Sequence, residues 1–254
     1  MRAEFLGVPI DLLTHEQTVG KAVHAMLTRK TTHHAAMNVA QLVKLRRDPE
    51  LRRDVAESQI VGVDGMGIVW GARALGIKVP ERVAGVDLME SLLGICAAHD
   101  FRPYFLGARH NVLQKALINA LHRWPGLRFA GYHDEYFSRE DESHIVDEIR
   151  ASRADCLFLA IPTPRKERFL HQHRDVLGVP FIMGVGGALD VLAGYVKRAP
   201  RRLQTSGLEW LYRSCQQPRR MGLRYVSNNA TFAAMLGKEL VARAFRGDRV
   251  PQHP

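Results

Sequence analysis

The sequence predicts an α/β fold with a Rossmann-like, mostly parallel sheet flanked by helices and followed by a basic helical C-terminal appendage. Three observations lead to this prediction. Short apolar runs alternate with segments whose apolar residues recur at helical spacing. The alternation stops near Ala193, and no strand-like run follows it. Positive charge is concentrated in that same C-terminal stretch.

Six apolar runs have the length and flanking turn residues of buried strands, and helical patterns lie between them. Right-handed crossovers between parallel strands would then place helices on both faces of the sheet. We expect strands at residues 32–37, 60–63, 103–106, 127–130, 156–161 and 180–183, and helices at 15–27, 39–47, 86–98, 111–123 and 140–150.

The chain changes character after residue 194, so we expect an α/β domain over residues 1–194 and an appendage over 195–254. Two helices are expected in the appendage, at 207–217 and 223–245, separated near Pro218. Twelve Lys/Arg and three Asp/Glu give the appendage a charge of +9, out of +10 for the chain. Such asymmetry indicates an anionic partner.

No apolar run approaches the roughly 18 residues that span a bilayer, and the N-terminus lacks a signal-peptide pattern. We therefore expect a cytoplasmic protein. Cys96, Cys156 and Cys215 form neither a disulfide framework nor a metal pair, and we expect them to be buried apolar residues. The histidine pairs lack a metal-binding context and are expected to be surface or packing residues.

Polar or glycine-rich segments follow five of the expected strands. In open parallel sheets, ligands bind beyond the carboxyl ends of the strands. Glycine lets the backbone approach a phosphate, although glycine can equally serve only to make a tight turn. Because five such segments converge on one edge, we predict a nucleotide-type ligand there. The segments begin at Asn38, Asp64, Gly107, Pro162 and Gly184.

Asp64 is the strongest candidate for a reactive group. A carboxylate on a strand-end turn can be partly desolvated and serve as a general base, whereas the alternative is an N-cap for a helix starting at Met66. Asp87 precedes an apolar helical run and has Glu90 three residues later, which predicts a capping box. Asp190 is expected either to cap a helix or to bind a ribose hydroxyl or base edge.

No DxD triplet occurs, so a metal held on a diphosphate by paired aspartates is not expected. The charge of a diphosphate would instead be met by backbone N–H groups, helix dipoles and Arg or Lys side chains. Neither a P-loop nor a GxGxxG fingerprint is present. We expect no metal and no cofactor.

Several segments together resemble the WecG/TagA/CpsF glycosyltransferases, in order and over nearly the whole chain. The most specific are ERVAGVDLM (81–89) and KRAPRRLQTSGLEWLYR (197–213) with the following PRRMGLRY (218–225). VDGMGIVW (63–70), YFLGA (104–108), PTPRKE (162–167) and MGVGGALDVLAG (183–194) accompany them.

This resemblance implies an inverting, metal-independent transferase of surface polysaccharide biosynthesis. It implies a UDP-sugar as co-substrate and a saccharide on undecaprenyl diphosphate as acceptor. It further implies that Asp64 is the general base and that appendage arginines complete the active site near the membrane. Taken together, the strand-end segments and the resemblance give these candidate substrate-binding residues: Asn38, Arg82, Asp87, Gly107, Tyr136, Arg165, Lys166, Glu167, Gly186, Gly187, Asp190, Arg213, Arg219, Arg220 and Arg224.

Two positions depart from the pattern of the family. Ala36 replaces a Thr in the family's Thr-x-Asn, and PTPRKE replaces G-x-P-[KR]-Q-E, with Pro162 for Gly and Lys166 for Gln. Because these positions lie near the donor site in the family, the donor sugar is not carried over. A donor without an N-acetyl group, such as glucose, is a hypothesis that fits the changes.

The expected partners are the UDP-sugar, the lipid-linked acceptor and an anionic membrane surface, so we expect peripheral association with the inner face of the plasma membrane. Trp210, Leu211, Tyr212 and Phe245 among the basic residues favour this surface over nucleic acid, for which no motif is present. A homo-oligomer is compatible with the sequence. The alternatives are a non-catalytic nucleotide-sugar-binding regulator, a basic nucleic-acid-binding protein, and a basic face that only aids solubility.

Overall fold

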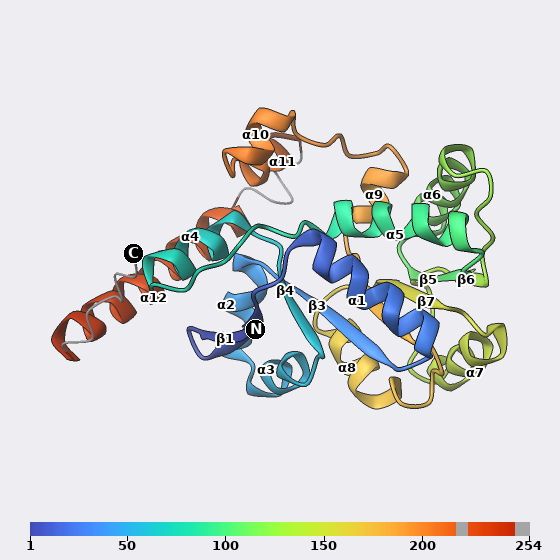
Figure 1. The fold of residues 1–254 in the computed structure, drawn as a ribbon, viewed down its shortest axis with the longest axis horizontal. Coiled ribbons are helices and arrows are strands. Elements are labelled where there is room, and N and C mark those ends of the chain that lie inside the picture. The colour runs from blue at the N-terminus through green and yellow to red at the C-terminus, as the bar shows by residue number, and fades with distance from the viewer. Residues whose placement is uncertain (217–222, 247–254) are drawn as a thin grey trace.

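The computed structural model describes residues 1–216 and 223–246, apart from the side chains of residues 205, 213, 214, 223–225 and 246. An eight-stranded sheet forms its centre, with helices on both sides; the last helix extends from the left end, and the two short helices before it lie above the sheet in this view (Figure 1). The strand order is β1-β2-β4-β3-β8-β7-β5-β6, and among these strands only β1 and β2 pair antiparallel. The α/β, mostly parallel fold predicted from the sequence is thus confirmed. The strands are β1 (Arg2–Phe5), β2 (Val8–Asp11), β3 (Thr32–Met37), β4 (Ile60–Val63), β5 (Pro103–Gly107), β6 (Gly131–His133), β7 (Cys156–Ala160) and β8 (Phe181–Gly184).

Most interior strands are buried along their whole length because helices cover both faces. Every residue of β5, β7 and β8 is buried. Along the chain, β3 leads outward to β4, and the other half of the sheet returns through β5 and β7 to β8. The strands β3 and β8 are therefore neighbours at the junction of the two halves, where α/β sheets bind ligands.

Alternation of side chains along the strands divides the core into two faces. Phe158 and Met183 point to the face covered by α1 (His15–Thr28), α5 (Gly85–His99), α6 (His110–Arg123) and α9 (Ala188–Leu192). Leu157 and Ile182 point to the opposite face, under α7 (Glu142–Ser152) and α8 (Arg165–His173). The helices α2 (Val39–Arg47) and α3 (Pro49–Ala56) belong to the core cluster that contains Val61 and Val63.

Helices begin where the sequence supplies a capping side chain. Thr14 and Gln17 form a capping box at the start of α1. Asn38 and Asp48 accept hydrogen bonds from the backbone of α2 and α3, and Pro49 occupies the first turn of α3. Each cap satisfies an amide that the helix itself leaves without a partner.

The C-terminal helices are α10 (Arg201–Thr205), α11 (Glu209–Gln216) and α12 (Leu223–Arg246). Phe232 of α12 is only 9% exposed; its ring lies 6.3 Å from that of Phe5, and it also contacts α4 (Met66–Ala74). The Arg243 guanidinium donates to the Leu75 carbonyl oxygen at 2.8 Å. Hence α12 packs on the α/β core beside α4 (Figure 1). Within residues 1–216 and 223–246, no helix combines the length and apolarity that crossing a membrane requires.

Several expectations need correction. Residues 127–130 are not a strand, and the edge strand β6 follows them at Gly131–His133. The short hairpin of β1 and β2 was not predicted, nor were the short helices α3, α8, α9 and α10. Cys96 and Cys156 are buried as expected, with their sulfurs 3.7 Å apart, but Cys215 is exposed. It lies on α11 with Leu211, whose side chain is also exposed.

Candidate active site

Asp64 directly follows β4, at the carboxyl end of the sheet, and is half-buried. Its Oδ1 accepts a hydrogen bond from the amide of Gly85, the first residue of α5, at 3.1 Å. Its own amide donates to the Met37 carbonyl oxygen at 2.9 Å. These contacts fix the carboxylate where β3, β4 and the N-terminus of α5 meet.

None of three aspartates at this edge caps a helix, although capping was expected for Asp87 and was the alternative role for Asp64 and Asp190. The N-cap of α4 is Gly65, with no side-chain capping bond, because the Asp64 carboxylate turns toward α5 instead. Asp87 is not an N-cap, since α5 begins two residues earlier, and Glu90 pairs with Arg123. Asp190 lies inside the first turn of α9 rather than at its cap.

Four alternating charges form a chain of ion pairs between the body and the appendage, which we call the ion-pair chain: Arg82, Glu209, Arg198 and Asp87. Glu209 Oε2 lies 3.0 Å from Arg82 Nη1, and Oε1 lies 3.1 Å from Arg198 Nε. Arg198 in turn donates to both carboxylate oxygens of Asp87, at 2.8 and 3.2 Å. Burial lowers the pKa of Arg198, but Asp87 and Glu209 outweigh it and hold the pKa above its usual value.

Backbone packing holds the appendage against the same edge. Gly207, in the turn between α10 and α11, has a φ of +75°, and a Cβ there would lie 2.6 Å from Trp70 ring atoms and 2.9 Å from the Met66 Cβ. The Gln216 side chain exchanges two 3.0 Å hydrogen bonds with the backbone of Lys197. The α10–α11 segment therefore contacts the first turns of α4, just after Asp64.

A second polar cluster lies between α2 and α8 and consists of Gln41, Thr163, Lys166 and Glu167; we call it the Glu167 cluster. Oε1 of the buried Glu167 accepts from Gln41 at 2.9 Å and from Thr163 at 3.1 Å, and it pairs with the Lys166 ammonium at 3.1 Å. Its Oε2 is buried and has no hydrogen-bond partner among the described residues.

The Glu167 cluster lies over the carboxyl end of β8. A Cβ on Gly184 would be 2.7 Å from the Lys166 Nζ, so the lysine side chain covers the last residue of that strand. Burial by itself raises the pKa of Glu167, but Lys166 and several hydrogen bonds outweigh it and hold the pKa below its usual value. Glu167 is therefore a buried carboxylate that remains ionised.

The turn after β8 presents backbone to solvent. Gly186 and Gly187 are exposed, and a Cβ on Gly186, whose φ is +46°, would meet no atom within 4 Å. Asp190 is half-buried, and a Cβ on Gly187 would lie 3.7 Å from its Oδ2. Asn38 lies across the junction at the end of β3, where its Oδ1 accepts from the amide of Gln41 at 3.0 Å.

Other predicted residues have structural contacts or lie outside the description. Gly107 has a φ of +108°, and a Cβ there would be 2.7 Å from the Ala160 backbone, so this turn requires glycine whatever it binds. Arg165 donates to the Phe137 carbonyl oxygen at 2.7 Å and stacks on its ring. Tyr136 is exposed on the loop after β6. Arg213, Arg219, Arg220 and Arg224 fall outside the described side chains.

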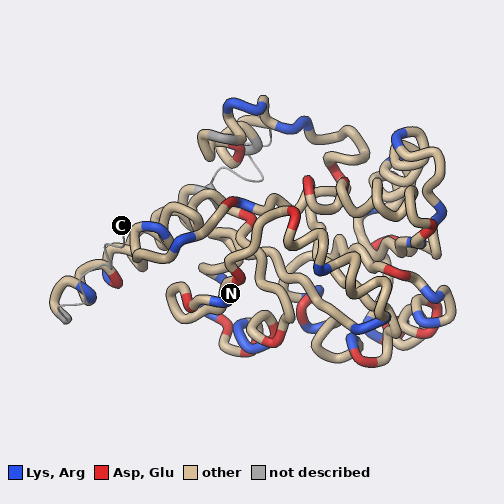
Figure 2. The backbone as a smooth tube through the Cα atoms, viewed as in Figure 1, with Lys and Arg blue, Asp and Glu red and all other residues tan. Residues whose placement is uncertain are grey.

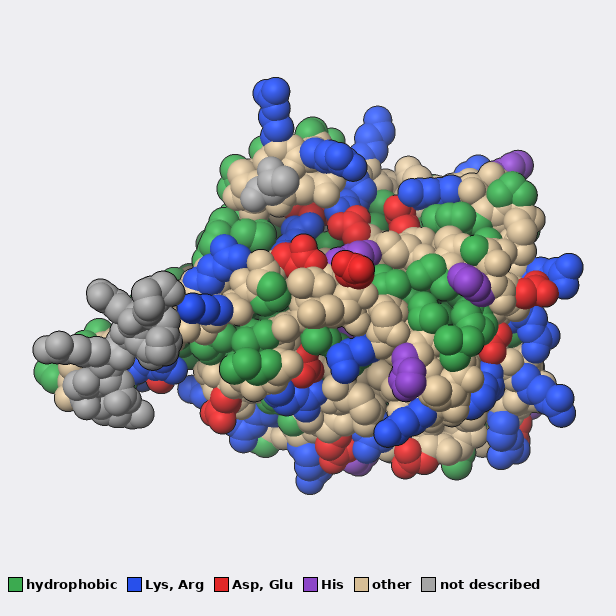
Figure 3. All heavy atoms as spheres, viewed as in Figure 1, with side chains coloured by type: hydrophobic (Ala, Val, Ile, Leu, Met, Phe, Trp, Pro, Cys, Tyr) green, Lys and Arg blue, Asp and Glu red, His purple; other side chains and the backbone are tan. Residues whose placement is uncertain are grey.

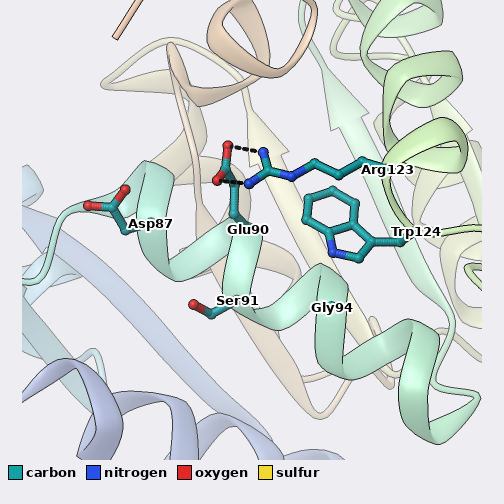
Figure 4. A pocket seen from close by; sticks show the side chains of 6 residues that line it. All are labelled: Asp87, Glu90, Ser91, Gly94, Arg123 and Trp124. Carbon is teal, nitrogen blue, oxygen red and sulfur yellow. Dashed lines mark hydrogen bonds and ion pairs between the residues drawn. The ribbon is translucent and has the colours of Figure 1, made fainter. Parts of the chain in front are cut away.

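A pocket on α5 adjoins the ion-pair chain at Asp87 (Figure 4). Arg123 pairs with Glu90 at 2.8 Å, and its guanidinium lies 4.8 Å from the centre of the Trp124 ring. The guanidinium therefore covers one side of the ring. The pocket is lined by Asp87, Glu90, Ser91, Gly94, Arg123 and Trp124.

Sequence reasoning missed four residues of these clusters: Gln41, Thr163, Arg198 and Glu209. Arg198 and Glu209 stand in the two segments, KRAP and GLEW, that carry the resemblance. The opposite charges of these residues and of Arg82 and Asp87 were visible in the sequence. They could not be recognised as ion pairs, because only the fold brings positions 82 and 209 together.

Comparisons with known proteins identify the family of this chain. The sequence profile described as "Glycosyl transferase WecG/TagA/CpsF family" matches residues 3–246. The chain belongs to the WecG/TagA/CpsF glycosyltransferase family. The match covers both the sheet and the appendage, so both are parts of the glycosyltransferase.

A relative from Bacillus is named for an activity. A Bacillus spizizenii protein named N-acetylglucosaminyldiphosphoundecaprenol N-acetyl-beta-D-mannosaminyltransferase is 33% identical over 174 residues, which cover 68% of this chain and 67% of that protein. Among solved structures, a substrate-binding periplasmic protein from Ralstonia solanacearum aligns with 89% of this chain and 67% of its own, at 16% identity and a TM-score of 0.31. That structural likeness is too weak to bear on fold or function.

Proposed function

We propose that this glycosyltransferase moves a sugar from a UDP-sugar to a saccharide on undecaprenyl diphosphate, with inversion, without a metal, and with Asp64 as general base. The observation that carries the proposal is the Asp64 carboxylate, half-buried at the end of β4 and oriented by the Gly85 amide. A base needs such a fixed orientation toward the proton that it removes.

The donor would lie across the junction of β3 and β8. The exposed turn at Gly186 and Gly187 lets the diphosphate approach the backbone closely, and Lys166 supplies a cation nearby. The unpaired Oε2 of Glu167 is a natural acceptor for a sugar hydroxyl, because a buried carboxylate oxygen gains from a hydrogen bond.

The reaction would be a single displacement. Asp64 removes the proton from an acceptor hydroxyl, whose oxygen forms a bond to the anomeric carbon of the donor. The bond from that carbon to the diphosphate oxygen breaks, and UDP leaves with the electron pair. Attack and departure on opposite sides invert the anomeric centre. Cationic side chains and strand-end N–H groups stabilise the charge that develops on UDP.

The appendage would meet the membrane surface that carries the acceptor. Lys and Arg lie on the α10–α11 segment (Figure 2), and several project from it in the space-filling view (Figure 3). Leu211 is 45% exposed and Phe245 is 88% exposed. Basic residues interleaved with exposed apolar side chains suit an anionic bilayer surface.

The identity of the donor sugar is a separate part of the proposal. The Bacillus relative is named for transfer of N-acetylmannosamine to an acceptor bearing N-acetylglucosamine. In this chain Ala36 and Lys166 occupy the positions of the family's donor-site Thr and Gln. We propose that these exchanges favour a donor without an N-acetyl group, such as UDP-glucose.

A donor panel tests both parts of the proposal. Purified full-length protein would be incubated with a synthetic polyprenyl-diphosphate N-acetylglucosamine, and UDP release and product mass would be measured for each UDP-sugar. Acceptor-dependent release supports the transferase. Reaction with UDP-N-acetylmannosamine alone would overturn the donor proposal, whereas no release with any donor would count against the function itself.

A further inference from the structure

The ion-pair chain joins the appendage to the residues beside Asp64. Arg82 lies three residues before Gly85, the residue whose amide orients the Asp64 carboxylate. Between them, the Val83 amide donates to the Val63 carbonyl oxygen at 2.8 Å, so this segment runs along the end of β4. A group that fixes the position of Arg82 therefore also restrains the segment that orients the Asp64 carboxylate.

Glu209 is the centre of this chain. Each of its two carboxylate oxygens faces a different arginine, at 3.0 Å and 3.1 Å. The side chains of Glu209, Arg82 and Arg198 are only 12%, 14% and 18% exposed. Solvent screens such pairs less than surface pairs, and removing one partner leaves the other charges poorly compensated.

We propose that Glu209 is a positioning residue: it docks α11 over the strand-end edge and holds Arg82 and Arg198 as a fixed pair beside the Asp64 site. Without its charge, Arg82 loses the ion pair that the described residues give it, and its guanidinium lies near that of Arg198, which keeps Asp87 as its partner. Like charges at short range repel, so α11 separates from the edge and Arg82 loses its fixed orientation. The effect on turnover rests on the proposed transferase function, whereas the docking does not.

The test compares Glu209→Gln with Glu57→Gln in the full-length protein. Glu57 is a matched control because it also bridges two basic side chains, Arg174 at 2.7 Å and His171 at 3.4 Å. It lies just before β4, at the opposite edge of the sheet. Amide hydrogen exchange of residues 201–216 measures docking, and steady-state UDP release gives kcat and KM.

In Glu209→Gln we expect exchange of residues 201–216 to rise by about tenfold or more and kcat/KM to fall by at least about tenfold, with the thermal transition of the sheet unchanged. Glu57→Gln should change neither readout. Glu209→Asp keeps the charge but is one methylene shorter, so it should restore part of both. The partial rescue separates a positional role from a general loss of folding.

Two results would overturn the proposal. Unchanged exchange in Glu209→Gln would show that the carboxylate does not dock α11. Increased exchange with unchanged kcat and KM would show that docking does not position the site. If the wild type releases no UDP, the proposed function fails, and the exchange experiment still decides whether Glu209 docks the appendage.

Discussion

His33 and His34 are adjacent buried residues of β3 whose rings lie on opposite faces of the sheet. Burial, reinforced by the charge of Lys166, lowers the pKa of His33 to about 3 and that of His34 to about 4. An unfolded chain binds protons at these histidines below pH 6.5, while the folded protein does not. Stability is therefore lost as the pH falls from 6.5 toward 4.

We expect the free energy of unfolding to drop by about 1.4 kcal/mol per pH unit for each histidine in that window. Denaturant titrations between pH 7 and pH 5 measure the slope. Among the described residues neither ring nitrogen of His34 has a hydrogen-bond partner, so His34→Leu breaks no bond. In this variant, the part of the slope of unfolding free energy against pH that comes from the two histidines should fall by about half. An unchanged slope would show that His34 does not contribute to the pH dependence.

At the residue scale, the sequence predicted Asp64 and the turn after β8 because each follows a recognisable buried strand. It did not predict the role of Glu209, whose partner Arg82 lies far away in the chain. Nor could it determine where the Asp64 carboxylate points. Local sequence left a cap on α4 open as the alternative role, but the fold brings the Gly85 amide within 3.1 Å of the carboxylate.

The α10–α11 segment depends on the turn at Gly207. An L-residue is strained at a φ of +75°, and a Cβ would overlap the side chains of Trp70 and Met66. We expect Gly207→Ala to cost about 1–3 kcal/mol of docking free energy and to lower kcat/KM by at least about tenfold. Steady-state UDP release provides the measurement.

The control for that prediction is Gly20→Ala. Gly20 lies within α1, and a Cβ there would meet no atom within 4 Å. Alanine should stabilise this helix slightly and leave kcat/KM unchanged. Equal activity of the two variants would mean that the contact of α10–α11 with α4 has no part in turnover.

At the element scale, interior strands were predictable because burial on both faces leaves a continuous apolar run. Long amphipathic helices were predictable because burial of one stripe leaves an apolar period of about 3.6 residues. The hairpin of β1 and β2 lies at the sheet edge, and its four-residue strands are only partly buried. Residues 127–130 are apolar for another reason: Leu127 and Phe129 pack into the core from a loop. Apolar composition alone did not distinguish a buried strand from a loop that packs into the core.

The whole molecule combines a nearly neutral body with a basic appendage. We expect it to float with vesicles containing anionic lipid at low ionic strength and to be released as salt shortens the Debye length. Arg201→Glu with Arg202→Glu should weaken this binding strongly. Arg52→Glu with Arg53→Glu, on α3, makes the same change in net charge and should weaken it much less. Equal weakening would mean that net charge alone, rather than the appendage, binds the lipid.

The most direct test of the account is Asp64→Asn, because the amide keeps an oxygen for the Gly85 N–H but cannot accept the acceptor's proton. UDP binding by calorimetry and acceptor-dependent UDP release would be measured on the same preparations. We predict that kcat falls by about a hundredfold or more while the Kd for UDP stays within about twofold of the wild type. Retained turnover, or loss of UDP binding in step with turnover, would contradict Asp64 as the general base.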